Sequence, residues 1–496
     1  MNLPEKPFQY KMLIDGNWIE SESKERYERK SPAHNVPVGE YPAATVEDVN
    51  NAVATAHRKF IEGQWPKMKG ADRAKIIGRV GDLIRKNKEE LGYIECLESG
   101  KPITQAIDEM VWAAGIWDYA ATLPYHTYGD SYNTLGENML AMTIREPLGV
   151  VGMITPWNFP LLIISQKLPF ALAVGCTTVT KPAEITSGTT IKLHELLLQA
   201  GVPAGVANVV TGSGGVIGNC LSQHPDISMI SFTGSTEVGK KVLQNAKSNV
   251  KKVELELGGK NPQLVFADCD FDAAVDAVVF GVFFNQGECC NSGSRLLIQD
   301  EIADEFVQAV IKKSKTVPIG DPLDPKTKVG AIVSESQFNT IMNYVKAGEK
   351  EGAELRLGGK QMITKTGRYI EPTIFDKVSP EMSIANDEIF GPVLSVLRFK
   401  TKEEAINIAN DSIYGLSASV WTKDIDTAIT LSRKLEAGTV WINTFMDGFP
   451  ELCFGGYKES GLGRELGHFA VEEFTELKTI LMHTGPRDYW WKQPEK

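Results

Sequence analysis

The sequence is poor in histidine and cysteine. Each occurs seven times in 496 residues, and no two cysteines form a CxxC pair. Without a spaced set of Cys and His ligands, we expect no structural metal ion. An odd number of scattered cysteines is typical of reduced thiols, so the chain is predicted to be cytoplasmic.

Long uninterrupted apolar runs and an excess of basic residues are also missing. The apolar stretch 161–175 is interrupted by Gln166, Lys167 and Pro169, so it predicts a buried helix rather than a membrane span. The first residues, MNLPEKPFQYKM, contain no apolar segment typical of a secretory signal. A formal net charge of -11 argues against a nucleic-acid partner, because such proteins usually carry a basic surface.

A regular alternation of strand and helix patterns begins at residue 148. The first block, 148–258, opens with the strand PLGVVGMITP and closes with the strand KKVELELGG, and a second block runs from Asn261 to GTVWINTF. This alternation predicts an α/β fold built on parallel sheets. A chain of 496 residues is also too long for one simple core, so two or three domains are expected.

Three stretches fall outside this alternation. The first 120 residues carry helical patterns, notably 46–63 and 72–99. Residues 126–147 are turn-rich and then extended, which predicts a hairpin that leaves the main body. The tail segment EEFTELKTILMH predicts an isolated strand, and such a strand often pairs with another element or another subunit.

Cys290 and Glu256 each lie beside a glycine-rich turn. Cys290 is in FFNQGECCNSGSR, and Glu256, thirty-four residues earlier, is in ELELGGKNP. A thiol in such a turn can act as a nucleophile, and a carboxylate can act as a general base. Together the two side chains could form and hydrolyse a thioester, whereas either one alone is an ordinary residue near glycines.

Two strand ends of the first block carry residues that suit a dinucleotide. Gly234 and Gly239 bracket the start of a helix, where glycine admits a close ligand and the helix N-terminus favours negative charge. Lys181 and Glu184 follow another strand, at the edge where open α/β sheets bind ligands. Glu184 would accept bonds from ribose hydroxyls and repel a 2′-phosphate, which favours NAD over NADP. A tight strand–helix turn and a solvated strand end are the alternatives.

Taken as a set, the motifs resemble those of the NAD(P)-dependent aldehyde dehydrogenase superfamily over essentially the whole chain. They occur in the family's order, and the spacing from Glu256 to Cys290 also fits. The motifs that carry the resemblance are TPWNFP (155–160), KPAE (181–184), FTGSTEVG (232–239), ELGGKNP (256–262), NQGECC (285–290), EIFGPV (388–393) and FGGYKESGLGRELG (454–467).

The resemblance implies the aldehyde dehydrogenase fold, with two Rossmann-like parallel-sheet domains and a β extension for oligomerisation. It implies an NAD-binding domain formed by 1–125 and 148–258, and a catalytic domain formed by 259–465. The extension would comprise 126–147 and 466–496, and it implies a homodimer or a homotetramer.

The resemblance also assigns five catalytic positions. Cys290 matches the nucleophile, and Glu256 matches the base that activates water. Asn158 matches the side chain that stabilises the oxyanion, together with the backbone N–H of Cys290. Lys167 and Glu465 match a pair that some members use as a proton relay, and a purely structural ion pair is the alternative.

The cofactor positions implied by the resemblance follow the same motifs. Lys181 and Glu184 match the groups that hold the adenosine ribose, and Glu388 and Phe390 match contacts to the nicotinamide half. NAD is the expected cofactor, with NADP less favoured. The remaining implied cofactor contacts are Ile154, Thr155, Pro156, Trp157, Gly214, Phe232, Gly234, Ser235 and Leu257.

The implied substrate tunnel is less informative about its aldehyde. Betaine-aldehyde members usually carry Trp where this chain has Gln166, and succinic-semialdehyde members tend to carry Arg there, so Gln166 weakens both assignments. An aromatic box would be partial, formed by Phe159 and Phe445 with Trp112 or Trp117. The tunnel residues implied by the resemblance are Phe159, Ile163, Gln166, Cys289, Phe445 and Cys453.

Two carboxylates in the loop 445–454 decide the expected substrate. Asp447 and Glu451 would favour a cationic aldehyde, unless both point to solvent. We therefore expect oxidation of a small polar or amino-substituted aldehyde, with a betaine aldehyde, a succinate-semialdehyde type or a broad aliphatic substrate as alternatives.

Two rival functions share the fold. A CoA-acylating dehydrogenase generally lacks the base that matches Glu256. A binding protein that had lost the chemistry should lack Cys290, Glu256 or Asn158, and all three are present.

Overall fold

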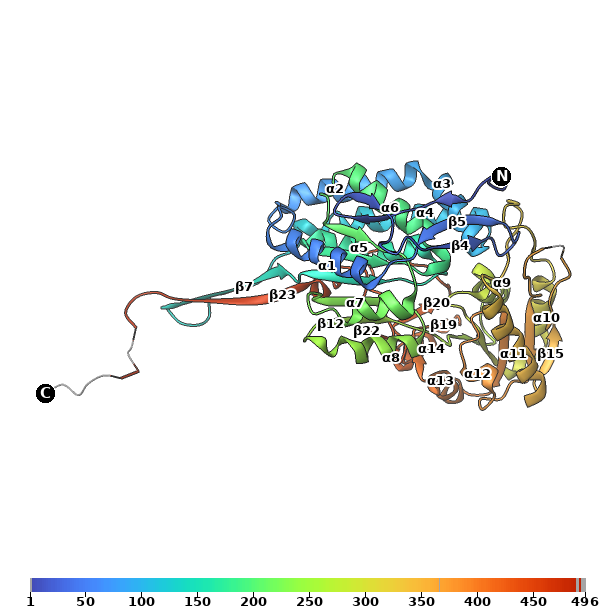
Figure 1. The fold of residues 1–496 in the computed structure, drawn as a ribbon. Helices are drawn as coiled ribbons and strands as arrows, with labels where there is room; N and C mark the ends of the chain where they lie inside the picture. The colour runs from blue at the N-terminus through green and yellow to red at the C-terminus, as the bar shows by residue number, and fades with distance from the viewer. Residues whose placement is uncertain (1, 365, 488–489, 492–496) are drawn as a thin grey trace.

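The computed structural model describes residues 2–364, 366–487 and 490–491. Two large sheets flanked by helices form the body, and a long β-sheet arm projects from it (Figure 1). The predicted α/β class with parallel sheets is confirmed. The last residues of the predicted extension, 488–489 and 492–496, lie outside the described residues.

The first sheet has eight strands in the order β22-β12-β11-β8-β9-β10-β2-β3. Its central strands are parallel, and only the edge pairings are antiparallel. The strands are β2 (Met12–Ile14), β3 (Asn17–Ile19), β8 (Val150–Ile154), β9 (Thr177–Lys181), β10 (Ala207–Val209), β11 (Met229–Thr233), β12 (Lys252–Glu256) and β22 (Gly461–Leu462).

Helices from two parts of the chain cover this sheet. Those that connect its parallel strands are α5 (Pro160–Val174), α6 (Gly188–Ala200), α7 (Asn219–Gln223) and α8 (Thr236–Asn245). Those from the first 120 residues are α1 (Val46–Ile61), α2 (Gly70–Lys86), α3 (Lys88–Ser99) and α4 (Ile103–Ala120).

The second sheet has seven strands in the order β15-β16-β17-β14-β13-β19-β20, and only β15 is antiparallel to its neighbour. Its strands are β13 (Pro262–Val265), β14 (Arg295–Gln299), β15 (Glu354–Leu357), β16 (Thr373–Asp376), β17 (Val393–Phe399), β19 (Ser417–Trp421) and β20 (Thr439–Ile442). Its helices are α9 (Phe271–Phe283), α10 (Ala303–Ser314), α11 (Glu335–Glu351), α12 (Ser383–Asn386), α13 (Lys402–Asn410) and α14 (Ile425–Lys434).

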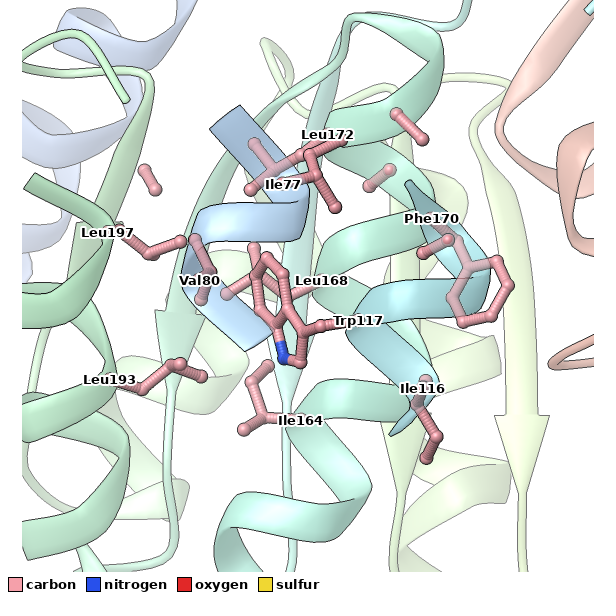
Figure 2. Packing of buried hydrophobic residues seen from close by; sticks show 14 of the residues in the cluster. Ile77, Val80, Ile116, Trp117, Ile164, Leu168, Phe170, Leu172, Leu193 and Leu197 are labelled. Atoms are coloured by element: carbon pink, nitrogen blue, oxygen red, sulfur yellow. The ribbon is translucent and has the colours of Figure 1, made fainter. Parts of the chain in front are cut away.

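A large apolar core lies between helices on one face of the first sheet. Trp117 of α4 is fully buried there, among Val80 of α2 and Ile164 and Leu168 of α5 (Figure 2). Its indole N–H donates to the Ser165 hydroxyl at 3.0 Å. Trp117 is therefore a core residue with its one polar atom satisfied, and it does not belong to a substrate box.

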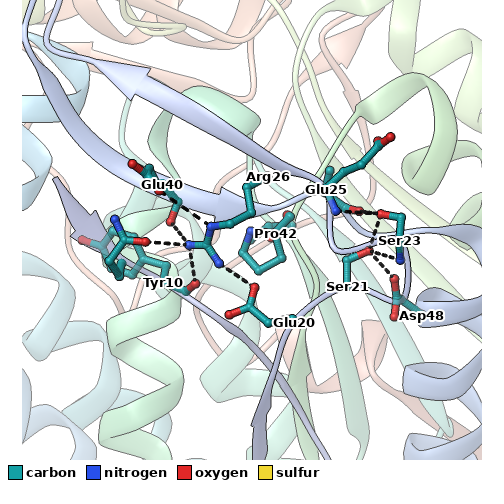
Figure 3. A network of polar contacts seen from close by, with 12 residues as sticks. Tyr10, Glu20, Ser21, Ser23, Glu25, Arg26, Glu40, Pro42 and Asp48 are labelled. Carbon is teal, nitrogen blue, oxygen red and sulfur yellow. Dashed lines mark hydrogen bonds and ion pairs between the residues drawn. The ribbon is translucent and has the colours of Figure 1, made fainter.

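The first 42 residues form strands that the helical reading of the N-terminal region missed. They are β1 (Phe8–Gln9), β4 (Arg26–Lys30) and β5 (Pro37–Pro42), besides β2 and β3. Each is six residues or shorter, so none has a long alternating pattern. The Arg26 guanidinium ties this region together by donating to the carbonyls of Tyr10 and Glu40 at 3.0 and 2.9 Å (Figure 3).

The helical pattern predicted over 72–99 is divided in the structure. Helix α2 ends at Lys86 and α3 begins at Lys88, because Asn87 leaves the helical conformation with φ -105° and ψ 14°. Its backbone N–H still donates to the Leu83 carbonyl at 3.1 Å, and its side-chain amide adds a second bond to the same carbonyl at 2.7 Å.

The arm is a three-stranded antiparallel sheet. Strand β7 (Met139–Pro147) pairs along its whole length with β23 (Thr475–His483), and β6 (Ser131–Tyr132) flanks β7. The two stretches predicted to leave the body therefore lie side by side, although more than 300 residues separate them in the chain. The remaining short elements are β18 (Tyr414–Gly415), β21 (Tyr457–Lys458) and α15 (Ala470–Glu473).

Candidate active site

The candidate site lies where the two sheets face each other. In the first sheet the register places Ile154 beside both Lys181 and Phe232, and Thr233 beside Glu256. These residues end four neighbouring parallel strands, so they share the carboxyl edge at which open α/β sheets bind ligands. The chain crosses directly from Glu256, at the end of β12, to Pro262, at the start of β13.

The second sheet contributes its opposite edge. The segment with Cys290 precedes β14, and the segment with Glu388 and Phe390 precedes β17. Asn261, in the crossing from β12 to β13, ties that crossing to the Cys290 segment, because its side-chain amide donates to the carbonyls of Cys290 and Ser292 at 2.7 and 2.9 Å. Sequence reasoning did not single out Asn261, although it is part of the ELGGKNP motif.

Cys290 sits on an irregular loop that follows α9. Asn285, Gln286 and Gly287 have φ values of 50°, 58° and 76°, a left-handed run that is unfavourable for residues with a Cβ. The hydrogen bond with the Cys289 thiol and burial raise the pKa of Cys290 well above its usual range. The thiol in this resting arrangement is therefore protonated, and it must lose its proton before it can attack.

Asn158 lies beside this loop, just before α5. Its side-chain amide donates to the Glu288 carbonyl at 3.2 Å, and the Asn285 amide donates to the Asn158 carbonyl at 3.3 Å. An amide NH₂ has two hydrogens, so one can fix the Asn158 side chain while the other serves a substrate oxygen. The structure therefore brings Asn158 and the Cys290 loop together.

Glu256 is buried and polar, with no fixed partner. Among the described residues, neither of its carboxylate oxygens has a hydrogen-bond partner. Burial, followed by the nearby carboxylates of Glu465 and Glu254, raises its pKa well above the usual range. Gly455 leaves room for this side chain, since a Cβ there would come within 2.8 Å of Glu256 Oε1.

Lys167 and Glu465 form a buried ion pair, as their residue types suggest. Lys167 Nζ also donates to the Ser231 hydroxyl at 2.9 Å and lies 3.9 Å from Glu254 Oε2. Ser231 in turn donates to Glu254 at 2.5 Å. The pair thus belongs to a four-member network. Glu254 and Ser231 were missed, although Glu254 lies two residues before Glu256 and so on the same face of β12.

The adenosine side of the cofactor site combines a buried amine with an exposed carboxylate. Lys181 is buried, which lowers its pKa to about 8, and among the described residues its ammonium donates only to the Pro182 carbonyl, at 2.8 Å. Glu184 is exposed and starts a short 3₁₀ turn. The buried Thr155 hydroxyl has no partner among the described residues. These groups retain free capacity for the hydroxyls of a ribose.

The nicotinamide side is formed by the loop before β17. The Gly259 N–H donates to Glu388 Oε1 at 3.0 Å, and burial raises the Glu388 pKa to about 7. Phe390 has a φ of 55° and packs edge-on against Trp157 at 5.3 Å between ring centroids. Gln337 holds this conformation by donating to the Phe390 carbonyl at 2.8 Å.

The remaining predicted cofactor residues occupy the same edge. Ser235 caps the N-terminus of α8 by accepting from the Val238 N–H at 3.4 Å. Gly239 allows α8 to pack directly on Leu257, where a Cβ would collide. Gly214 begins an exposed turn whose far end, Gly218, faces Lys181 and Ile154. Along the same edge, Pro156 follows β8, Phe232 lies within β11 and Gly234 follows β11.

The predicted substrate residues separate into two groups. Phe159, Ile163 and Cys289 form one buried cluster, to which Phe284 and Met446 add contacts. The other predicted positions do not join it. Gln166 is partly buried, Cys453 is exposed, and Phe445 packs in another cluster against Trp441. Phe284 was missed because nothing in its local sequence marks it as a tunnel residue, whereas Met446 lies in the loop 445–454 that the resemblance places along the tunnel.

An aromatic groove adjoins this cluster. Its volume is about 540 Å³, and its walls include Trp112, Phe280 and Phe284. Phe284 stacks on Phe159 with ring centroids 6.0 Å apart, so the groove shares a wall with the cluster around Cys289. Of the two tryptophans considered for an aromatic box, Trp112 lies here and Trp117 does not.

Two searches of the described residues gave negative findings. No described helix combines the length and the apolar character needed to cross a membrane. No group of three or more His, Cys, Asp and Glu side chains within the described ranges is arranged to hold a metal ion.

Comparison with known proteins agrees with this geometry. The profile of the aldehyde dehydrogenase family matches residues 18–480. Betaine aldehyde dehydrogenase of Bacillus subtilis is 42% identical over 97% of this chain and 99% of its own length. The crystal structure of an NAD-dependent aldehyde dehydrogenase from Sinorhizobium meliloti is 48% identical, with a TM-score of 0.97, and covers 98% of this chain and 97% of its own.

A third relative was solved with the cofactor. A Cys-to-Ala variant of an indole-3-acetaldehyde dehydrogenase from P. syringae, in complex with NAD⁺, is 40% identical with a TM-score of 0.95, and 97% of each chain is covered. The chain therefore belongs to the aldehyde dehydrogenase family, and it is an enzyme that oxidises an aldehyde with NAD as its cofactor.

Proposed function

We propose that this chain converts an aldehyde to a carboxylic acid through a covalent intermediate on Cys290. The Cys290 sulfur attacks the aldehyde carbon and forms a thiohemiacetal. The single observation that carries this assignment is the contact of Asn158 with the loop of Cys290. The Asn158 side-chain amide donates to the carbonyl of Glu288, two residues before Cys290. The second amide hydrogen of Asn158 and the Cys290 N–H then stabilise the oxygen that becomes negative.

Several residues along the sheet edge are proposed to hold NAD. Lys181 and Glu184 would bind the adenosine ribose, and Glu388 would accept from the second ribose. When bound, NAD supplies the acceptor for the hydride that leaves the thiohemiacetal carbon, which leaves a thioester on Cys290. A carboxylate at 184 disfavours a 2′-phosphate, so NADP should be the poorer cofactor.

Glu256 is proposed to complete the cycle. Its carboxylate removes a proton from water, which attacks the thioester carbon and releases the acid and the Cys290 thiol. Its unpartnered oxygens leave it free to bind that water. The charge of the Lys167 ammonium lowers the pKa of Glu256 and so favours the ionised base. We propose that Lys167 and Glu465 act through this charge, whether or not they also relay the proton.

The substrate is proposed to be a small polar or amino-substituted aldehyde. Asp447 and Glu451 support this class through their place on the loop that also carries the tunnel residue Met446, whereas their exposure favours the alternative in which both face solvent. One observation favours a second candidate, an aldehyde with a bulky apolar body. The groove with Trp112, Phe280 and Phe284 has room for such a group. In addition, the Phe159 ring already faces the Lys101 ammonium at 4.5 Å, which competes with a cationic substrate.

We further propose a cytoplasmic homo-oligomer that pairs through the arm. Leu140, Leu477, Leu481 and Met482 of the arm are exposed apolar residues that a second copy would cover. The proposed division of labour assigns NAD binding to 1–125 and 148–258 and catalysis to 259–465. A dimer and a tetramer are both compatible with the arm.

One panel of assays tests the function. NADH formation should be measured with aminopropanal, betaine aldehyde, succinic semialdehyde, hexanal and phenylacetaldehyde, each with NAD and with NADP. A preference for hexanal or phenylacetaldehyde would reject the polar substrate class and favour the apolar groove. Cys290→Ala should abolish NADH formation with every aldehyde, with Cys269→Ala, in the core of the second sheet, as the matched control. Appreciable turnover by Cys290→Ala would show that the nucleophile is misassigned.

A further inference from the structure

The loop that carries Cys290 has an unfavourable backbone that must be held in place. Asn285, Gln286 and Gly287 are consecutive left-handed residues, and the first two carry side chains. Gly287 is required because a Cβ there would collide with the carbonyl of Gly391. Such a conformation persists only where surrounding contacts over-determine it.

Three side chains of this loop supply those contacts, and they reach two other backbone segments, at Asn158 and at 330–333. The Asn285 amide donates to the Asn158 carbonyl at 3.3 Å and to the Glu288 carbonyl at 2.9 Å. Gln286 Oε1 accepts from the Gly330 N–H at 3.1 Å. Glu288 Oε1 accepts from the Val333 N–H at 3.0 Å. Of these three, Glu288 is closest in sequence to Cys290, and its carbonyl is also the anchor of Asn158.

Val333 is a firm anchor because its peptide is held from both sides. Its N–H donates to Glu288, and its carbonyl accepts from Arg29 Nη2 at 2.9 Å. The charged groups that face the Glu288 carboxyl are Arg29 and Lys101. Lys101 is itself fixed by the buried carboxylates of Glu95 and Glu109. A side chain with 1% exposure is thus placed between a rigid backbone anchor and two fixed cations.

Burial raises the pKa of Glu288 to about 8. The carboxyl is therefore largely neutral at neutral pH, and a neutral acid accepts the Val333 hydrogen bond through its carbonyl oxygen. An amide of the same shape presents the same acceptor, so the role requires an oxygen at this point and not a negative charge.

We propose that Glu288 is a positioning residue for the reaction. By anchoring to the Val333 peptide, it fixes the loop that carries the Cys290 nucleophile and the carbonyl that orients Asn158. The proposal rests on the proposed function, because it takes Cys290 as the nucleophile and Asn158 as the oxyanion donor.

Two substitutions of Glu288 separate the effect of losing the hydrogen-bond acceptor from the effect of changing the side-chain volume. Glu288→Met keeps most of the volume and removes the acceptor, whereas Glu288→Gln keeps both. The exposed Glu301, replaced as Glu301→Gln, is the matched control. We expect kcat to fall about 10²-fold in Glu288→Met, as for other small misplacements of reacting groups, with KM for NAD unchanged within about twofold. Glu288→Gln should stay within about threefold of the unmodified enzyme, with the same kcat–pH profile.

A second readout does not depend on aldehyde turnover. The alkylation rate of Cys290 by iodoacetamide, followed by mass spectrometry, should change about tenfold in Glu288→Met and little in Glu288→Gln. Turnover by Cys290→Ala would refute the proposed function, whereas an unchanged alkylation rate in Glu288→Met would refute the positioning role alone. Glu288→Met with the activity of Glu301→Gln would also overturn the inference. Should Glu288→Met fail to fold, loss of activity in Glu288→Gln would still contradict it.

Discussion

The two reacting side chains of the site are held in opposite ways. Cys290 lies on an irregular, left-handed loop whose carbonyls and side chains are bonded to neighbouring segments, including the Asn261 amide at 2.7 Å. Glu256 ends a regular strand that is paired on both sides, yet among the described residues its carboxylate has no partner. The nucleophile is fixed through its backbone, and the base is fixed only up to its Cα.

This difference suits the two steps. Attack on an aldehyde requires that the Cys290 sulfur keep one fixed position relative to the oxyanion donors. The hydrogen bonds that hold the Cys290 loop supply this position. Water activation requires a carboxylate whose oxygens remain available, and bonds to protein donors would occupy them. A regular strand fixes the backbone of Glu256 without using hydrogen bonds to its carboxylate. Cys290 needs a strained loop, because its thiol and its N–H must reach the same point.

The largest effect on turnover should come from removing the Glu256 carboxylate while leaving the Cys290 loop unchanged. In Glu256→Gln the steady-state kcat should fall by about 10² to 10⁴-fold, because water attack on the thioester loses its base. A first burst of NADH, about one per active site, should remain. Rapid mixing measures both phases, with the exposed Glu349→Gln as control. A lost burst with normal steady-state turnover would reverse the two assignments.

A substitution beside the Cys290 loop should instead slow the first burst of NADH. Asn158→Ala removes the donor for the oxyanion, so the burst rate itself should fall by about 10² to 10³-fold. Thioester hydrolysis would then no longer limit the rate, and the burst should disappear into a single slow phase. A variant that kept a fast burst would show that Asn158 only supports the loop.

A pH series compares the two groups in one protein. The pKa values of Cys290 and of Glu256 are both raised, the first by the Cys289 hydrogen bond and burial, the second by burial. Both reactive forms are deprotonated, so the burst rate and kcat should rise as pH increases from neutral. In Glu256→Gln the burst rate should keep the dependence that belongs to Cys290. A rate that falls with increasing pH would contradict both assignments.

The smallest effect should come from the network behind Glu256. Lys167→Met removes the ammonium that lowers the Glu256 pKa, so the kcat–pH profile should move toward alkaline pH. At neutral pH this corresponds to a loss of roughly tenfold, because less Glu256 is ionised. The exposed Lys346→Met serves as control. An unshifted profile with lower thermal stability would indicate a structural pair alone.

The fold could be predicted where long periodic patterns exist. The strands and helices predicted in 148–315 and 394–445 appear as expected, because these patterns are long enough to show their period and their flanking turns. Helix α11 and strands β15 and β16, which lie between these two ranges, were not predicted. Strands β1, β2 and β3, before residue 43, could not be predicted, since a strand of two or three residues exists only through its partners. The break at Asn87 could not be predicted either, because it interrupts a helical pattern that is continuous in the sequence.

Some residues of the candidate site could likewise be predicted from the sequence, and others could not. Motif residues such as Cys290, Glu256 and Asn158 could be named from the sequence, because their types and order carry the chemistry. Glu254 and Phe284 could not, because a buried glutamate or a phenylalanine has no local mark of function. Phe445 and Trp117 show the converse, since aromatic type alone suggested a box that their packing against Trp441 and Ser165 does not form.

Periodicity in the sequence predicted the class of fold, and the order of its motifs supplied the family resemblance from which the proposed reacting groups and the expected preference for NAD follow. Only the tertiary structure decided how those groups are held. It joined β7 to β23 across more than 300 residues, and it anchored the strained loop of Cys290 to the distant Val333 peptide. It also left the Glu256 oxygens unpartnered. Hydrogen bonds between segments far apart in the chain depend on packing, and local sequence does not specify them.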